Sequence, residues 1–267
     1  MRVSRDEIQT STNQIEIGSA THVGRVRRTN EDNYRVVPAR KLFVLSDGIG
    51  GQANGEVASG MAVETILIQC LQSSAKQEEA QSGISATTNR LLSAARSANR
   101  AIFEASALDR RLEGMGATLV AAWIEDLRMS LVNVGDSRVY LLRAGQLKTL
   151  TADHTLVAEQ VRSGLLTQEQ AKTNPLRRIL IRALGAREEV EIDTSEQELR
   201  GGDSLLLCSD GLTCMVPESE ILEILSHDCD AQCAADRLVA AANEHGGEDN
   251  VTVILVRIAT NAGQDGS

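Results

Sequence analysis

Two stretches that lie far apart in this chain have the same construction, an apolar strand that ends in Ser-Asp-Gly. They are LFVLSDG at 42–48 and LLLCSDG at 205–211. An apolar run of this length, closed by a turn signal, is typical of a strand. The pattern therefore predicts two strands that each deliver a carboxylate, Asp47 or Asp210, to a strand end.

Two further aspartates stand next to apolar strands. Asp136 follows the segment 128–134, and Asp249 comes just before the segment 251–258. A single Asp-Gly is usually only a turn, but four carboxylates at strand ends are unusual. If the last strand runs antiparallel to the others, all four meet at one end of the sheet, where they repel unless cations lie between them. Oxygen ligands without His or Cys favour Mg²⁺ or Mn²⁺ over Zn²⁺.

The order of elements indicates an α+β fold. Strands come first, then two long helices, more strands, and finally helices with a last strand, without the regular βα alternation of a nucleotide-binding sheet. We expect two sheets flanked by helices, with helices over 56–72 and 84–106 antiparallel and joined by a flexible connection at 73–83. The other expected elements are a helix over 231–244 and strands over 15–21, 42–46, 117–124, 128–134, 139–142, 190–192, 205–208 and 251–258.

Composition narrows the class of protein. The chain has 267 residues, 42% of them apolar, which fits one large domain. Its longest apolar runs are of strand length, which predicts no membrane span, and its first fifteen residues are polar, which argues against a secretory signal and predicts a cytoplasmic protein. The five cysteines form no C-x-x-C pair and are expected to be reduced, without a metal role.

Charge and aromatic content exclude two kinds of partner. The formal net charge is −10 and no basic run of five or more residues occurs, which disfavours nucleic acid and anionic membranes. Aromatic residues make up 2% of the chain, so it has no stacking platform for bases or sugars.

The segment RVRRTNEDN at 25–33 leaves two interpretations open. Its arginines, Arg25, Arg27 and Arg28, precede the acidic pair Glu31 and Asp32. They can form a surface salt-bridge cluster of little energetic value. Alternatively, a guanidinium close to metal-binding carboxylates can bind a phosphate through two hydrogen bonds. The spacing alone does not choose between these interpretations.

Taken together, these motifs resemble the metal-dependent protein phosphatase family, in the bacterial form of protein phosphatase 2C. The resemblance runs nearly end to end and implies a four-layer αββα sandwich, with two central, mostly antiparallel sheets, flanking helices and a flap insertion. The segments that carry it, in order, are HVGRVRRTNEDN (22–33), FVLSDGIGG (43–51), GMGATL (114–119), NVGDSRVYLLR (133–143), LTADHTLV (150–157), IRALG (181–185), LLLCSDGLT (205–213) and GGEDNVTVILV (246–256).

The resemblance implies metal ligands at particular residues of this chain. Asp47 would bridge the two core Mg²⁺ or Mn²⁺ ions, and Gly48 would offer its backbone carbonyl to the first. Asp210 and Asp249 would bind the second ion. Asp136, together with Asp210, would hold the third ion found in many bacterial members.

Other roles follow from the same resemblance. Arg27 matches the phosphate-binding arginine and, with Asp47, is the predicted catalytic pair. Glu31 and Asp32 match acidic positions that act near the metals through bound water. Residues 153–178 match the flap, which is thought to influence substrate access.

Three positions depart from the family pattern or allow another interpretation. Ile49 stands where many eukaryotic members carry a histidine considered a general acid, so the leaving group must take its proton from water or another residue. Asn174 replaces a histidine common in the flap. We interpret His22 and His154, which lie inside matched motifs, as structural rather than catalytic.

The implied activity is hydrolysis of phosphoserine and phosphothreonine in proteins, with a metal-bridging water attacking phosphorus directly. The catalytic domain is expected over 15–259, between a disordered tail at 1–14 and a flexible tail at 260–267. The expected partners are phosphoproteins made by serine/threonine kinases, and the expected state is a monomer. Two alternatives are a weakly active regulatory module that binds phosphoproteins and a metal-dependent phosphoesterase of small molecules.

Overall fold

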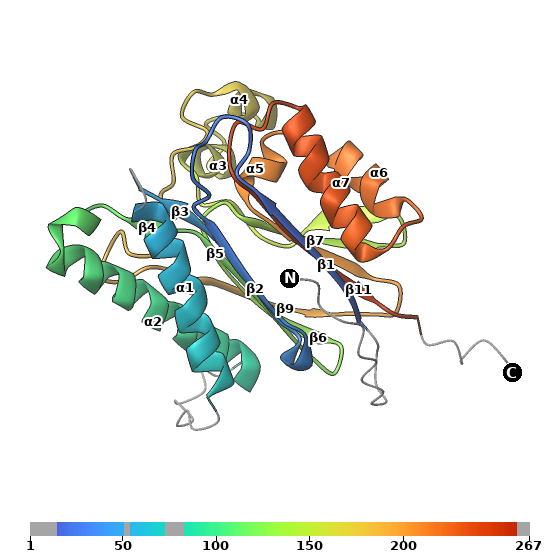
Figure 1. The fold of residues 1–267 in the computed structure, drawn as a ribbon, viewed down its shortest axis with the longest axis horizontal. Helices are drawn as coiled ribbons and strands as arrows, with labels where there is room; N and C mark the ends of the chain where they lie inside the picture. Colours follow the sequence, from blue (N-terminus) through green and yellow to red (C-terminus); the bar gives the residue numbers. More distant parts are fainter. Residues whose placement is uncertain (1–14, 51–53, 73–82, 261–267) are drawn as a thin grey trace, which may run out of the picture.

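The computed structural model describes residues 15–50, 54–72 and 83–260, which form two facing β-sheets with helices on their outer faces (Figure 1). All strand pairs within the sheets are antiparallel. The predicted α+β class and the αββα layering are therefore confirmed. The expected tail at 1–14 lies outside the described residues, as do positions 73–82 of the expected connection and 261–267 of the second tail.

Each sheet combines strands from distant parts of the chain. The first has the order β2-β3-β5-β6-β9, and β4 pairs with the end of β3. Its strands are β2 (Asp32–Val37), β3 (Leu42–Ile49), β4 (Gly116–Ala117), β5 (Leu119–Glu125), β6 (Arg128–Val134) and β9 (Asp193–Glu198). The second has the order β1-β11-β10-β7-β8, with β1 (Ile15–His22), β7 (Arg138–Arg143), β8 (Gln146–Thr149), β10 (Ser204–Cys208) and β11 (Val251–Ile258).

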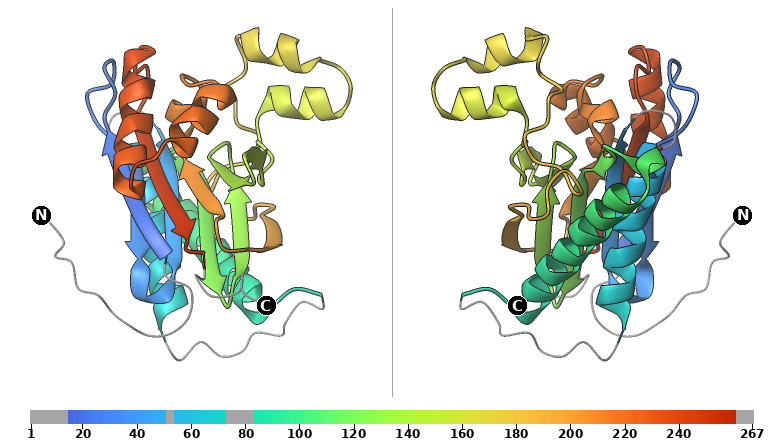
Figure 2. Two further views of the ribbon diagram at one scale, coloured as in Figure 1. Left: turned by 90° about the vertical axis from the view of Figure 1, so that its right-hand side faces the viewer. Right: turned by 90° about the vertical axis from the view of Figure 1, so that its left-hand side faces the viewer.

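The helices divide between the two sheets. The first sheet is covered by α1 and α2, which run antiparallel as predicted, and the second by the C-terminal helices (Figures 1 and 2). Within the described residues, no helix combines the length and apolarity that crossing a bilayer requires. The helices of these layers are α1 (Asn54–Leu71), α2 (Ala86–Leu108), α5 (Asp210–Thr213), α6 (Glu218–Ser226) and α7 (Ala231–Glu244), with short 3₁₀ turns at Pro38–Arg40 and Arg110–Leu112.

Strand β3 shows why a continuous apolar run suits this fold. Leu42 and Val44 belong to the core beneath α1 and α2, whereas Phe43 and Leu45 belong to the core between the two sheets. Successive side chains of a strand point to opposite faces, so a strand with a layer on each side needs apolar residues at every position. Burying each of these side chains contributes about 1.5–3 kcal/mol.

The stretch predicted as a flap forms two short helices, α3 (Leu156–Arg162) and α4 (Gln168–Thr173), that extend away from the sheets (yellow in Figure 2). Thr155 caps the first helix and Thr167 the second, the latter in a capping box with Gln170. The two ends of the excursion are tied together, because the Leu156 backbone N–H donates to the Ile179 carbonyl at 2.8 Å.

The strand predicted at 190–192 is wrong. Val190 and Ile192 pack against the core beneath α1 and α2 from an irregular segment, and the strand β9 begins only at Asp193. Its sequence, DTSEQE, has no apolar residue, yet it pairs with β6 through six residues at the sheet edge. An edge strand can form from backbone hydrogen bonds without apolar alternation, so its pattern gave no signal.

Candidate active site

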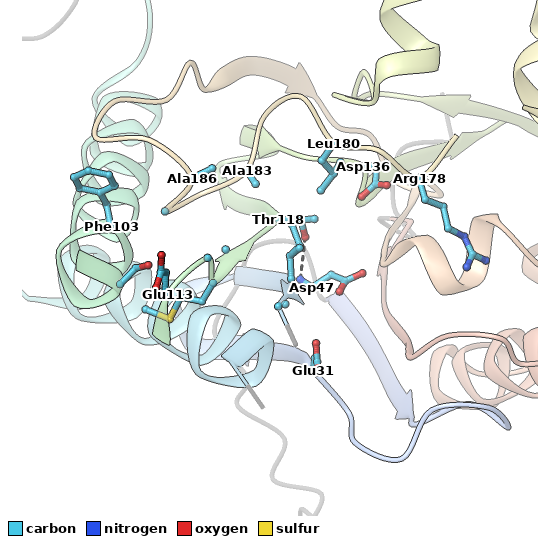
Figure 3. Close-up of a pocket in the computed structure, with 18 of the residues that line it drawn as sticks. Glu31, Asp47, Phe103, Glu113, Thr118, Asp136, Arg178, Leu180, Ala183 and Ala186 are labelled. Atoms are coloured by element: carbon cyan, nitrogen blue, oxygen red, sulfur yellow. Dashed lines mark hydrogen bonds between the residues drawn. The ribbon is translucent and has the colours of Figure 1, made fainter. Parts of the chain in front are cut away.

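The four predicted carboxylates line one cavity of about 960 Å³ at the ends of the strands. Figure 3 labels two of them, Asp47 and Asp136. Asp47 lies near the end of β3, and Asp136 lies in the turn between β6 and β7. Asp210 begins α5 two residues after β10, and Asp249 stands two residues before β11. The antiparallel pairing of β10 with β11 brings the last two to the same end of their sheet, as expected.

Close backbone contacts explain the glycine of both Ser-Asp-Gly motifs. A Cβ atom on Gly48 would lie 2.1 Å from the carbonyl oxygen of Gly55, at the start of α1. A Cβ atom on Gly211 would lie 1.9 Å from the carbonyl oxygen of Asn250. Any side chain at these positions would push the neighbouring backbone away from the aspartates.

Thr118 links the segments that carry Asp47 and Asp136, a role the sequence analysis missed. The Asp47 backbone N–H donates to Thr118 Oγ1 at 2.9 Å, and the Thr118 backbone N–H donates to the Asp47 carbonyl at 2.8 Å (Figure 3). Thr118 Oγ1 is also 2.8 Å from the Oγ of Ser137, which comes directly after Asp136. Its place in the motif GMGATL was the available signal.

The electrostatics of the cavity fit cation binding. Burial, followed by repulsion from Asp32 and Asp210, raises the pKa of Asp47 well above its usual range. Burial and the charge of Asp210 raise the pKa of Asp136 to about 8. The pKa of Asp210 is raised by burial and by Asp249, and its Oδ1 has no hydrogen-bond partner. Crowded carboxylates with an unsatisfied buried oxygen are stabilised by a bound cation.

The donors at the cavity wall are carboxylate and carbonyl oxygens, which favours hard ions that keep water ligands. In the part of the chain that the structure describes, no three Asp, Glu, His or Cys side chains are arranged so that they hold one ion by themselves. Mg²⁺ commonly binds one or two carboxylates and retains several waters. The carboxylates and the Gly48 backbone at the cavity wall therefore fit Mg²⁺ or Mn²⁺ better than a fully protein-bound ion such as structural Zn²⁺.

Arg27 is the arginine of its motif that reaches the cavity. Its Nη2 donates to Asp249 Oδ2 at 2.9 Å, and 51% of its side chain is exposed. The other oxygen, Asp249 Oδ1, accepts from the backbone N–H of Asn250 at 2.9 Å. Arg25 and Arg28 do not line the cavity. Of the two interpretations of this segment, the geometry favours a guanidinium beside the carboxylates for Arg27.

Asn250 holds the Arg27 loop in place, a second role that the sequence analysis missed. Its Nδ2 donates to the carbonyls of Val23 and Thr29 at 2.9 Å each, and its Oδ1 accepts from the Glu31 backbone at 2.8 Å. The sequence did contain a signal, because Glu-Asp-Asn occurs at both 31–33 and 248–250.

The two acidic residues of the arginine motif are placed differently. Glu31 lines the cavity, but Asp32 does not. Asp32 is buried directly opposite Asp47 in the β2–β3 register, where its Oδ2 accepts from Ser209 Oγ at 2.8 Å and its Oδ1 has no partner. Burial raises the pKa of Asp32 to about 7.

Arg178, at the end of the flap, is a third residue that the sequence analysis missed. It lines the cavity, and its Nη2 donates to Glu248 Oε2 at 3.0 Å, next to Asp249 (Figure 3). Burial lowers the pKa of Arg178, but Cys214, Asp210 and Asp249 together outweigh burial and raise it. Only the folding of the flap brings this residue to the site, so its sequence neighbourhood carried no signal.

His154 is buried and does not line the cavity. Its Nδ1 accepts from the Gly135 backbone at 3.1 Å, and its Nε2 lies 3.2 Å from Asp193 Oδ2. Burial lowers its pKa. From its position outside the cavity, His154 therefore stabilises the turn that contains Asp136.

Comparison with known proteins agrees with this geometry. Residues 22–245 match the sequence profile of protein phosphatase 2C. The chain belongs to this family. It is 41% identical over 253 residues to the serine/threonine phosphatase stp of Listeria monocytogenes, which covers 92% of this chain and 98% of that protein. The predicted family and the predicted enzyme class, a protein serine/threonine phosphatase, are confirmed.

Solved structures of the family have the same architecture. The crystal structure of the Mycobacterium tuberculosis serine/threonine phosphatase PstP/Ppp is 38% identical and superimposes with a TM-score of 0.82, covering 92% of this chain and 99% of that one. The catalytic domain of PstP in complex with two manganese ions is 36% identical, with a TM-score of 0.80 and coverage of 93% and 100%. The predicted metal dependence thus agrees with the family.

Proposed function

We propose that this chain hydrolyses phosphoserine and phosphothreonine in proteins, using Mg²⁺ or Mn²⁺ ions held by the Gly48 carbonyl and the carboxylates of Asp47, Asp136, Asp210 and Asp249. The observation that carries the proposal is the gathering of these carboxylates, several with raised pKa values, around one cavity. Membership of a protein serine/threonine phosphatase family supports the substrate class.

Bound ions would supply an activated water for attack on phosphorus and would neutralise charge on the phosphoryl oxygens. The chain's own residues position these components. Thr118 fixes the strand end that carries Asp47, and Asn250 fixes the loop that carries Arg27. Arg27 can move its guanidinium from Asp249 to a phosphoryl oxygen, since half of its side chain is exposed at the cavity. Ile49 lines the cavity and cannot donate a proton, so the leaving group takes its proton from water or from another residue.

We also propose supporting roles for the two remaining acidic residues. Glu31, at the cavity wall, is placed to contact a bound ion through water. Asp32 is placed behind Asp47 and acts on it electrostatically through the β2–β3 pair.

A third ion next to Asp136 and Asp210 is part of the proposal, because burial and the charge of Asp210 raise the pKa of Asp136 and a bound cation would offset both. Asp136→Ala removes no ligand of the two core ions. A crystal structure of this variant grown in Mn²⁺ should therefore retain two ions, while turnover of a phosphothreonine peptide falls about tenfold or more. Unchanged peptide turnover would remove the third ion from the mechanism.

The oligomeric state, the compartment and the origin of the substrates are also part of the proposal. We infer that it acts as a monomer in the cytoplasm on phosphoproteins made by serine/threonine kinases. All five cysteines are free thiols in the structure, which supports a reducing compartment.

The experiment that tests the function compares a phosphothreonine peptide, p-nitrophenyl phosphate and a nucleoside monophosphate as substrates with Mn²⁺, Mg²⁺ or excess EDTA. We expect turnover of the first two with either ion and none with EDTA. Preference for the nucleotide over the peptide would favour a small-molecule phosphoesterase. Peptide binding without turnover would favour a regulatory module.

A further inference from the structure

The cavity extends well beyond the carboxylates. Asp136 and Arg178 lie at one end in Figure 3, and Phe103 and Ala186 lie at the other. Its volume of about 960 Å³ is at the upper end of the range for sites that enclose drug-sized ligands, and a phosphoryl group fills a small part of such a volume. The far end therefore has room for other parts of a substrate.

This far end, the α2 lobe, is walled mainly by small or apolar side chains. The last turns of α2 contribute Phe103 and Ala107, which stand one turn apart. Met115 comes from the approach to β4, and Ala183 and Ala186 come from the segment after the flap. Among the lining residues that the structure describes, Phe103 has the only ring, and the alanines leave open space next to it.

The wall formed by residues 183–186 is fixed in place. Leu184 and Ala117 exchange two backbone hydrogen bonds of 3.1 and 2.8 Å, and the Gly185 N–H donates to Asn99 Oδ1 at 2.8 Å. Gly185 has a φ of +80°, and a Cβ atom there would lie 2.2 Å from Ile102 Cγ2. A wall fixed by these hydrogen bonds is pre-organised, so binding a ligand requires little further ordering of it and costs less entropy.

The charged residues of the lobe do not favour a charged ligand. Arg110 and Glu113 both line it, so their opposite charges largely offset each other. The lobe is distinguished by its apolar wall, and a fixed apolar wall favours an apolar side chain.

We propose that the α2 lobe binds an apolar side chain of the phosphoprotein substrate, within a few residues of the phosphorylated position. This inference rests on the proposed function and extends it to substrate choice. The occupant is a peptide segment because the lobe is continuous with the carboxylate end of the cavity, so one extended chain can place its phosphate and a neighbouring side chain in the two parts at once. A simple phosphate monoester would leave the lobe empty.

The test uses phosphothreonine peptides in which a single leucine, glycine or aspartate is placed at each of three positions on either side of the phosphothreonine. Two variants, Ala107→Trp and Ala186→Trp, fill the lobe from exposed wall positions. Leu108→Trp is the matched control, because Leu108 neighbours Ala107 but is 88% exposed and does not line the cavity. Each kcat/KM is divided by the same protein's value for p-nitrophenyl phosphate.

The wild type and Leu108→Trp should prefer leucine over aspartate and glycine by about fivefold or more at one position or more. In Ala107→Trp or Ala186→Trp, or both, that preference should fall to within about twofold. The inference is overturned if no position prefers leucine, or if both lobe variants keep the full preference. Absence of wild-type turnover on every substrate, p-nitrophenyl phosphate included, would instead contradict the proposed function.

Discussion

The two Ser-Asp-Gly strands begin alike and end differently. Strand β3 continues through Asp47 to Ile49, where it pairs with β4, whereas β10 stops at Cys208 and Asp210 opens the helix α5. The serines also differ in their partners. Ser46 Oγ donates to the Thr118 carbonyl at 2.6 Å, and Ser209 Oγ donates to Asp32 Oδ2 at 2.8 Å.

The difference shows that one sequence pattern fixes the position of a carboxylate without fixing its backbone conformation. In both strands the apolar run packs between layers, and the glycine allows a neighbouring backbone to approach. The backbone after each aspartate takes a conformation that depends on this neighbour. Gly48 lies against the start of α1, and Gly211 lies against the loop before β11. Substitutions at both strand ends can test whether the two are equivalent in chemistry and in packing.

The largest expected effect comes from Asp47→Asn, compared with Asp210→Asn. Asp47 is the proposed ligand of both core ions, and its pKa is raised well above normal by burial and several carboxylates. Its substitution should lower kcat on p-nitrophenyl phosphate on the order of 10³-fold or more, and Asp210→Asn should lower it by a smaller factor. Steady-state kinetics in saturating Mn²⁺ measure both. Near-normal turnover by Asp47→Asn would show that it does not bridge the ions.

The two strand ends should tolerate a side chain in place of glycine equally poorly. Gly48→Ala and Gly211→Ala each force a Cβ into a backbone carbonyl, and each should lower the free energy of unfolding by about 3 kcal/mol or more. Gly60→Ala, inside α1, is the control, because the nearest atom to its Cβ would be 3.9 Å away. It should be neutral or stabilising by up to about 1 kcal/mol. Urea unfolding measures all three, and a stable Gly211→Ala would contradict the close contact with Asn250.

The pH dependence of stability should depend on the same carboxylates. In metal-free protein the fold keeps protons on Asp47 and Asp136 that the unfolded chain releases near the usual pKa of 3.8, so stability falls as pH rises from about 4 to about 8. Urea unfolding with chelator at several pH values should show this fall, and Asp136→Asn should reduce it. A flat profile in the wild type would be the contrary result.

Substitution of the two cavity arginines should raise KM to different extents. Arg27, which is paired with Asp249, should contribute to phosphate binding, so Arg27→Ala should raise KM about tenfold with metal affinity nearly intact. Arg28→Ala is its control, because Arg28 does not line the cavity. Arg178, which is paired with Glu248, should contribute less to phosphate binding, so Arg178→Met should raise KM by only about threefold. If Arg28→Ala proved more harmful than Arg27→Ala, the assigned register of this motif would be wrong.

The sequence predicted the layers, most of the described strands, the helices α1, α2 and α7, and the carboxylates that line the cavity, because apolar runs and strand-end aspartates are local signals. It did not predict the shorter helices α3, α4, α5 and α6. It did not predict β9, whose six residues are polar, or the loop that holds Val190 and Ile192. Arg178 was missed because its role depends on how the flap folds back. Thr118 lies in the motif GMGATL, but the motif does not show that its hydroxyl contacts the Asp47 backbone. These residues are identified by tertiary contacts, which no local pattern contains.

The most direct test of the metal site is the anomalous diffraction of crystals grown in Mn²⁺, which locates each ion independently of activity. We predict two strong peaks in the cavity, one beside Asp47 and the Gly48 carbonyl and one beside Asp47, Asp210 and Asp249, with waters completing the coordination. A third peak beside Asp136 and Asp210 is expected for the proposed third ion. Asp47→Asn crystals grown in the same way should lose at least one peak. Peaks located elsewhere, or a wild-type cavity without manganese in crystals of active enzyme, would contradict the claim that the two Ser-Asp-Gly strands form the metal site.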